Sequence, residues 1–112
     1  MKQSDLDDLK SLLRQYRKAR TVVRQAAKLH KDTSEPEKKR DEIFYRMVPH
    51  LKTIGKESKA FRDPFLKIVV RTYYFGKSAR EIAETYEFTE QYIFKLLRKA
   101  DRIMVTESEK ST

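Results

Sequence analysis

The stretch SAREIAETYEFTEQYIFKLLRKADRIM, from Ser78 to Met104, decides the fold of this chain. Ser78 and Glu81 have the spacing of a capping box, in which the Ser hydroxyl accepts a hydrogen bond from a free backbone N–H and the Glu side chain reaches back. We therefore expect a helix that begins near Ala79. The residues that fall on its packing side by helical spacing are Ile82, Ala83 and Tyr86.

A short turn is expected next, from Glu87 to Thr89. Thr89 is a favourable N-cap for a second helix, and Phe88 stands where a hydrophobic staple residue packs. The small Ala83 lets the two helices cross closely, so the spacing is that of a helix-turn-helix. A turn of this kind commonly has Gly where this chain has Glu87. Either Glu87 adopts a left-handed conformation, at a cost of about 1 kcal/mol or more, or the turn has another shape.

The second helix has an apolar stripe and an opposite polar face. The stripe consists of Ile93, Leu96, Leu97, Ala100, Ile103 and Met104. The opposite face holds Gln91, Lys95, Arg98 and Arg102, with Tyr92, Phe94 and Lys99 at its margins. Gln pairs with adenine, Lys and Arg pair with guanine, and the cations also bind phosphate. Basic faces of this kind are also common on helices that are merely solvated, but the caps and the turn favour nucleic acid.

A longer segment that contains this stretch resembles a known family. The segment FLKIVVRTYYFGKSAREIAETYEFTEQYIFKLLRKADRIM, from Phe65 to Met104, is similar to the fourth conserved region of bacterial sigma factors. It is also similar to the related helix-turn-helix of small phage and prophage late-gene regulators of the RinA and ArpU type. About forty of the 112 residues are covered. The matching residues are Tyr73 to Lys77, Glu81 to Ala83, Ile93 and Leu96.

The resemblance implies that the second helix enters the major groove. It carries base contact onto Thr89, Glu90, Gln91, Lys95 and Arg98, and places Ser78 and Arg80 near the DNA backbone. With Tyr92, Lys99 and Arg102 added from the polar face and its margins, the candidate DNA-binding residues are Ser78, Arg80, Thr89, Glu90, Gln91, Tyr92, Lys95, Arg98, Lys99 and Arg102.

The N-terminal region predicts a long basic helix, from about Ser4 to about His30. Its apolar side consists of Leu9, Leu12, Leu13, Tyr16, Ala19, Val23, Ala26 and Ala27. Lys and Arg residues line the roughly opposite side, and no acidic residue occurs between Leu9 and Lys31. The candidate electrostatic contacts are Arg14, Arg17, Arg20, Arg24 and Lys28. Three interpretations stay open: the stripe follows a phosphate backbone, binds an acidic partner, or keeps the helix soluble.

A second helix is expected after a polar turn, because Ser34, Pro36 and Glu37 combine a capping box with a first-turn Pro. Pro49 should bend or end this helix, and Gly55 to Ser58 is interpreted as a joint. The short connection between the two N-terminal helices favours an antiparallel hairpin, whose apolar edge is available for self-association.

The predicted fold class is therefore all-α, with an N-terminal helical hairpin followed by a three-helix unit that contains the helix-turn-helix. Asp63 and Pro64 begin the scaffold helix, which runs from Phe65 to Phe75 and closes at a left-handed Gly76. We expect residues 1–55 to form the basic hairpin, a candidate oligomerisation region. Residues 59–104 should form the DNA-binding unit, and residues 105–112 a disordered tail.

Composition limits the function classes. Lys and Arg outnumber Asp and Glu by 26 to 17, and the resulting net charge of +9 favours a polyanionic partner. The chain has no Cys, no apolar run of membrane-spanning length and no apparent secretory signal, so we expect a cytoplasmic protein that does not bind membranes. His30 and His50 have no third ligand at a useful spacing, and no catalytic motif is present. We expect neither an enzyme nor a cofactor.

The leading interpretation is a sequence-specific transcriptional regulator of phage type, an activator of late genes, acting in the host cytoplasm if a phage encodes it. Its expected partners are double-stranded DNA, a second copy of the chain and, by the resemblance, RNA polymerase. The alternative is the small subunit of a phage packaging terminase, which also joins a helix-turn-helix to a helical assembly region. A third interpretation is a protein-interaction module with weak, sequence-indifferent DNA affinity.

Overall fold

The computed structural model describes residues 1–110, and within that range every regular element is a helix. The α-helices are α1 (Gln3–Lys28), α2 (Ser34–Glu57), α3 (Pro64–Tyr74), α4 (Ala79–Tyr86) and α5 (Glu90–Lys110), and the 3-10 helix η1 (Ser58–Ala60) follows α2. The all-α fold class predicted from the sequence is confirmed.

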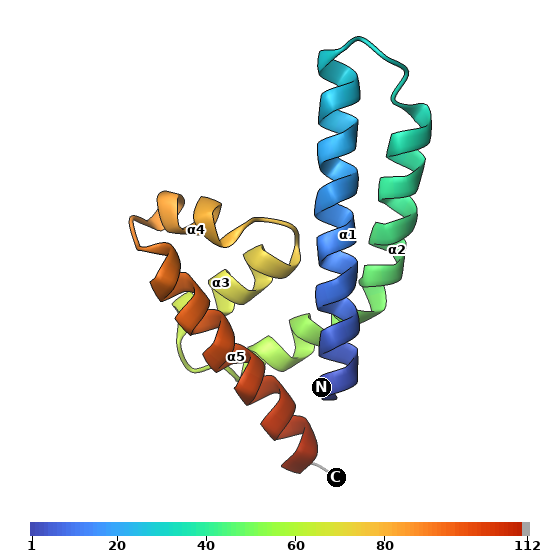
Figure 1. Cartoon of the computed structure of the whole chain (residues 1–112). Coiled ribbons are helices and arrows are strands. Elements are labelled where there is room, and N and C mark those ends of the chain that lie inside the picture. Colours follow the sequence, from blue (N-terminus) through green and yellow to red (C-terminus); the bar gives the residue numbers. More distant parts are fainter. Residues whose placement is uncertain (111–112) are drawn as a thin grey trace.

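The two longest helices, α1 and α2, lie side by side and antiparallel (Figure 1). Their facing sides bury Leu6, Leu9, Leu13 and Ala19 of α1 and Ile43, Met47, Leu51 and Ile54 of α2. This is the helical spacing of apolar residues that the sequence shows. The far ends of α1 and α2 extend beyond the other helices (Figure 1). The apolar residues there are consequently less covered, and Leu29 is 64% exposed.

The start of α2 differs from the predicted capping box. The helix begins at Ser34, and its N-cap residue Thr33 makes no side-chain cap hydrogen bond. The carboxylate of Asp32 instead accepts hydrogen bonds from the Ser34 backbone N–H at 2.9 Å and from the Ser34 hydroxyl at 2.6 Å. These two bonds lower the pKa of Asp32. The capping role thus belongs to a residue two positions earlier than expected.

The expectation that Pro49 bends or ends α2 is wrong about the end, because the helix continues to Glu57. A proline lacks the N–H that would bond the carbonyl four residues earlier, which is that of Tyr45. Both Pro49 and Tyr45 lie on the exposed side, where solvent can bind that carbonyl. Met47, Leu51 and Ile54 hold the helix in the core on both sides of the proline.

The remaining helices, which we call the α3–α5 part, are built around α3. Asp63 caps α3 by accepting from the Phe65 N–H at 2.9 Å, with Pro64 in the first turn. At the other end Gly76 has a φ of +116°, and the N–H groups of Gly76 and Lys77 bond the carbonyls of Tyr73 and Thr72. Both ends of α3 are as the sequence predicts.

One continuous apolar core joins the α1–α2 pair to the α3–α5 part. At the junction, Ser58 is fully buried, and its hydroxyl donates to the carbonyl of Gly55 and accepts from Nε of Arg71 on α3. The guanidinium of Arg71 also donates to the Gly55 carbonyl at 3.3 Å. The boundary expected between residues 55 and 59 falls at this connection, where buried hydrogen bonds fix how the two parts meet.

The C-terminal helix is longer than predicted. The disordered tail expected over residues 105–112 is instead helical from Val105 to Lys110, since α5 runs to that residue. Val105 is partly buried against the core and packs beside the start of α1. Residues 111–112 of the expected tail lie outside the described range.

Candidate nucleic-acid interface

The corner between α4 and α5 is built from two caps and a three-residue turn. The Ser78 hydroxyl accepts from the Glu81 N–H at 3.1 Å, and the Thr89 hydroxyl accepts from the Tyr92 N–H at 3.1 Å. Between them Glu87 adopts the left-handed conformation, with φ 61° and ψ 39°. The sequence left two possibilities open for Glu87, a left-handed conformation or another turn shape. The structure has the left-handed conformation.

The inner sides of both helices pack as their spacing predicts. Buried residues of α4 are Ala79, Ile82 and Ala83, and those of α5 are Ile93, Leu96, Leu97, Ala100 and Met104. Tyr86 departs from the prediction, because it lies at the rim with 39% of its surface exposed. Its ring meets Phe65 edge to face at 5.3 Å, and Phe88 packs beside Phe65 and Tyr92.

The outer face of α5 is open to solvent. Its exposed residues include Gln91, Lys95, Arg98 and Arg102, the four predicted to point outward together. The α1–α2 pair therefore does not cover this face. Thr89, Glu90, Tyr92 and Lys99 are exposed at its margins. The face thus presents long hydrogen-bond donors on one continuous helical surface.

Sequence reasoning left Phe94 out of the candidate site, yet 41% of its surface is exposed on α5. A phenylalanine is the kind of side chain that contacts the methyl group of thymine in a major groove. Its position one residue before Lys95, at the margin of the polar face, was visible in the sequence, but exposure is what distinguishes it from a core aromatic.

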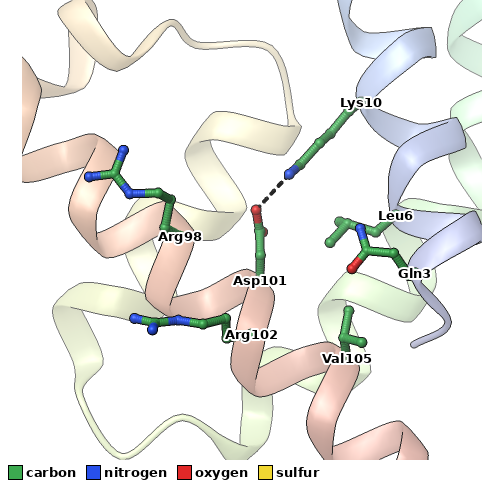
Figure 2. Close-up of a pocket in the computed structure, with 7 residues that line it drawn as sticks. All are labelled: Gln3, Leu6, Lys10, Arg98, Asp101, Arg102 and Val105. Carbon is green, nitrogen blue, oxygen red and sulfur yellow. Dashed lines mark ion pairs between the residues drawn. The ribbon is translucent and has the colours of Figure 1, made fainter.

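An ion pair links α5 to α1. Asp101 of α5 lies 2.8 Å from Nζ of Lys10 and accepts a hydrogen bond from the hydroxyl of Tyr74 at 2.9 Å. Figure 2 shows Lys10 and Asp101 pointing toward one another, whereas Arg98 and Arg102 point away from α1. The Asp101 side chain is only 16% exposed, whereas that of Lys10 is 38% exposed, so the carboxylate is the shielded partner of the pair.

Lys10 and Asp101 also line a groove of about 460 Å³ between the start of α1 and the middle of α5. Burial raises the pKa of Tyr74, and the neighbouring Asp101 carboxylate raises it further. The Tyr74 hydroxyl therefore stays protonated and donates to Asp101 throughout the neutral range.

The basic residues of α1 divide into two groups. Arg14, Arg24 and Lys28 are exposed. Arg17 and Arg20 are partly buried and donate to the carbonyls of Lys77 and Gly76, at 2.9 and 3.2 Å. The Arg17 guanidinium also lies 4.6 Å from the ring centre of Tyr73. Arg17 and Arg20 therefore hold the α3–α4 loop against α1, a structural task that the sequence did not reveal.

Of the two residues expected near the DNA backbone, one is likewise engaged within the protein and the other is exposed. Ser78 is partly buried and acts as the cap of α4, so its hydroxyl is already engaged. Arg80 is exposed, and its Nε lies 3.3 Å from the carboxylate of Glu84 one turn later. An exposed pair of this kind is weak, so the Arg80 guanidinium is free to exchange partners.

Residues 1–110 contain neither a metal-ligand cluster nor a membrane-spanning helix. Over that range no three His, Cys, Asp or Glu side chains are placed to hold a metal ion. In the same residues, none of the helices is both long enough and apolar enough to cross a membrane.

No protein-family model matches its sequence, no curated protein matches it, and no solved structure matches its fold.

Proposed function

We propose that this protein is a sequence-specific DNA-binding regulator of transcription, of the phage late-gene type, that reads the major groove with α5. In this proposal α4 and α5 are the two helices of a helix-turn-helix, and the α1–α2 pair is a helical hairpin. The observation that carries it is the outward face of α5, where Gln91, Lys95, Arg98 and Arg102 are exposed together behind a capped turn.

The charge distribution supports this choice. The chain carries a net charge of +9, and cations occupy both the outer face of α5 and the exposed positions of α1. In this proposal the long cationic side chains of α5 reach base edges, and those of α1 add attraction to the DNA backbone. The two helices are therefore assigned different tasks, base reading to α5 and electrostatic support to α1.

A binding-site selection from random duplexes tests the proposal, followed by affinity measurements on the selected site and on scrambled DNA. We expect Lys95→Ala and Arg98→Ala each to cost about 1–3 kcal/mol on the selected site and to relax its base preference. Arg14→Ala and Lys28→Ala are the control variants, because both residues are exposed on α1. They should weaken binding to both duplexes alike. Equal losses on both duplexes for all four variants would contradict the proposal.

Self-association is part of the proposal, because one short reading helix rarely supplies enough specificity. The distal part of the α1–α2 pair offers a surface for it, with Val22 and Leu29 exposed by 50% and 64%. The same surface would serve a packaging terminase subunit. Molar mass in solution separates the two: a dimer fits a regulator with two half-sites, and a ring of about eight chains or more fits packaging.

A further inference from the structure

A small pocket lies where α1 passes the N-terminus of α4, away from the outer face of α5. It has a volume of about 140 Å³ and is lined by Arg17, Arg20, Thr21, Arg24, Gly76, Ser78 and Glu81. Pockets that hold drug-sized ligands measure roughly 300–1,000 Å³, so this one suits a single small group.

The pocket concentrates positive charge. Arg17, Arg20 and Arg24 occupy successive turns of α1, and none of the three has a carboxylate partner within the described part of the chain. The one acidic side chain in the lining, Glu81, already lies 3.7 Å from Nζ of Lys77. Three guanidinium groups held close together repel one another unless an anion lies between them.

Hydrogen-bond donors are also left over at the same place. Nε of Arg17 is buried and has no acceptor within the described residues. The backbone N–H groups of Ala79 and Arg80, in the first turn of α4, have no acceptor inside their helix, and the helix dipole adds partial positive charge there. Arg17 and Arg20 each donate to one loop carbonyl, so the site combines guanidinium groups that have no carboxylate partner with N–H groups that have no acceptor.

We propose that this pocket binds a phosphoryl group, which in the complex with DNA is a phosphate of the backbone. Planar guanidinium groups and helix N-termini both favour the oxygens of phosphate, and the volume excludes a whole nucleotide. Phosphate binding is a property of the free protein, whereas the DNA backbone as the source of the phosphate rests on the proposed function. The pocket then joins α1, the α3–α4 loop and DNA in one contact.

The first test titrates inorganic phosphate into the full chain labelled with ¹⁵N. The expected result is saturable shifts in the backbone signals of Ala79 and Arg80 and in the Nε–H signals of the three arginines, with none from chloride at equal ionic strength. Arg24→Gln should weaken phosphate binding about tenfold, the loss expected for one charged hydrogen bond. Arg14→Gln removes the same charge from the same helix outside the pocket, and should leave the affinity unchanged.

The phosphate site is overturned by shifts that do not saturate, by equal shifts in chloride, or by equal losses in R24Q and R14Q. A second titration, with duplex DNA present in excess, tests the source. DNA that displaces phosphate supports the backbone assignment, and undiminished phosphate binding in the DNA complex overturns it. Phosphate binding without any sequence preference on DNA would reject the proposed function and keep the site. Sequence preference without phosphate binding would reject the site alone.

Discussion

At the scale of single residues, Glu87 shows how the α4–α5 corner tolerates an unfavourable residue. Its left-handed backbone, with φ 61°, costs about 1 kcal/mol or more for a side chain that has a Cβ atom. The N–H groups of Glu87 and Phe88 both bond the Ala83 carbonyl and close the helix end. The burial of Ile82 and Ile93 on both sides of the turn offsets this cost.

Glu87→Gly should therefore stabilise the protein by about 1 kcal/mol, because glycine adopts this conformation without strain. The change is measured as a shift of the urea unfolding midpoint. Glu84→Gly is the matched control, since Glu84 is exposed inside α4. The control should destabilise by about 0.5–1 kcal/mol. A loss of stability in E87G would show that the turn does not need the left-handed residue.

A second residue-scale prediction concerns Tyr74, whose hydroxyl is buried against Asp101. Its pKa in the folded protein lies above the ordinary value near 10, so its contribution to stability is complete below pH 10 and is lost as the pH rises above it. Urea unfolding between pH 8 and 11 should show stability falling by up to about 1.4 kcal/mol per pH unit at the alkaline end.

Tyr74→Phe should remove most of this alkaline slope while lowering stability at pH 8 through the lost hydrogen bond, by about 1 kcal/mol. Tyr45→Phe serves as the control, because Tyr45 is 72% exposed and should leave the slope unchanged. An alkaline slope that persists in Y74F would assign the effect to another group.

Much of the candidate site was visible at this scale before the structure. The caps at Ser78 and Thr89 and the outward face of α5 follow from local spacing, which the helix period fixes. The engagement of Arg17 and Arg20 was not visible, because their acceptors are backbone carbonyls far along the chain. Basic residues three or four apart have the same pattern whether they bind a carbonyl or face solvent.

At the scale of elements, helix ends were predictable where side chains cap them and unpredictable where tertiary packing decides. Asp63 and Gly76 mark both ends of α3 correctly. The end of α2 expected at Pro49 was wrong, because the core contacts of α2 on both sides outweigh one missing hydrogen bond. The end of α5 was placed too early for a related reason. Val105 packs against the core and continues the helix past its apolar stripe.

Pro49→Ala should stabilise α2 by about 1–3 kcal/mol, because alanine restores the hydrogen bond to the Tyr45 carbonyl and has the higher helix propensity. Thermal and urea unfolding measure the gain. Pro36→Ala is the matched control. Pro36 lies in the first turn of α2, where a backbone N–H has no acceptor inside the helix, so its replacement should change stability little. Equal effects of the two substitutions would argue against this account.

At the scale of the whole molecule, the chain is flat. Its Cα extents are 50 × 34 × 17 Å, so the smallest is no more than half of either other extent. Few residues are therefore covered on both sides, which leaves the outer face of α5 and the basic side of α1 open. Sequence periodicity predicts which side of each helix is buried, but it contains no information on how the α1–α2 pair meets the α3–α5 part.

That arrangement depends on contacts between distant residues, of which the Lys10–Asp101 ion pair is the most direct link between α1 and α5 (Figure 2). Asp101 is largely buried and also hydrogen-bonded to Tyr74, so its charge is less screened than that of a surface carboxylate. We expect the pair to contribute more than an ordinary exposed pair does, because both the geometry and the burial favour it.

A double-mutant cycle with Lys10→Met and Asp101→Asn should give a coupling energy of about 1 kcal/mol or more, since Asn keeps an acceptor for Tyr74 and the cycle isolates the pair. The same cycle on Arg80 and Glu84, an exposed pair one helical turn apart, should give about 0.3–0.5 kcal/mol. Urea unfolding of the four variants in each cycle provides the values. Equal coupling in the two cycles would mean that burial adds nothing, and that the core alone sets the angle between α1 and the outer face of α5.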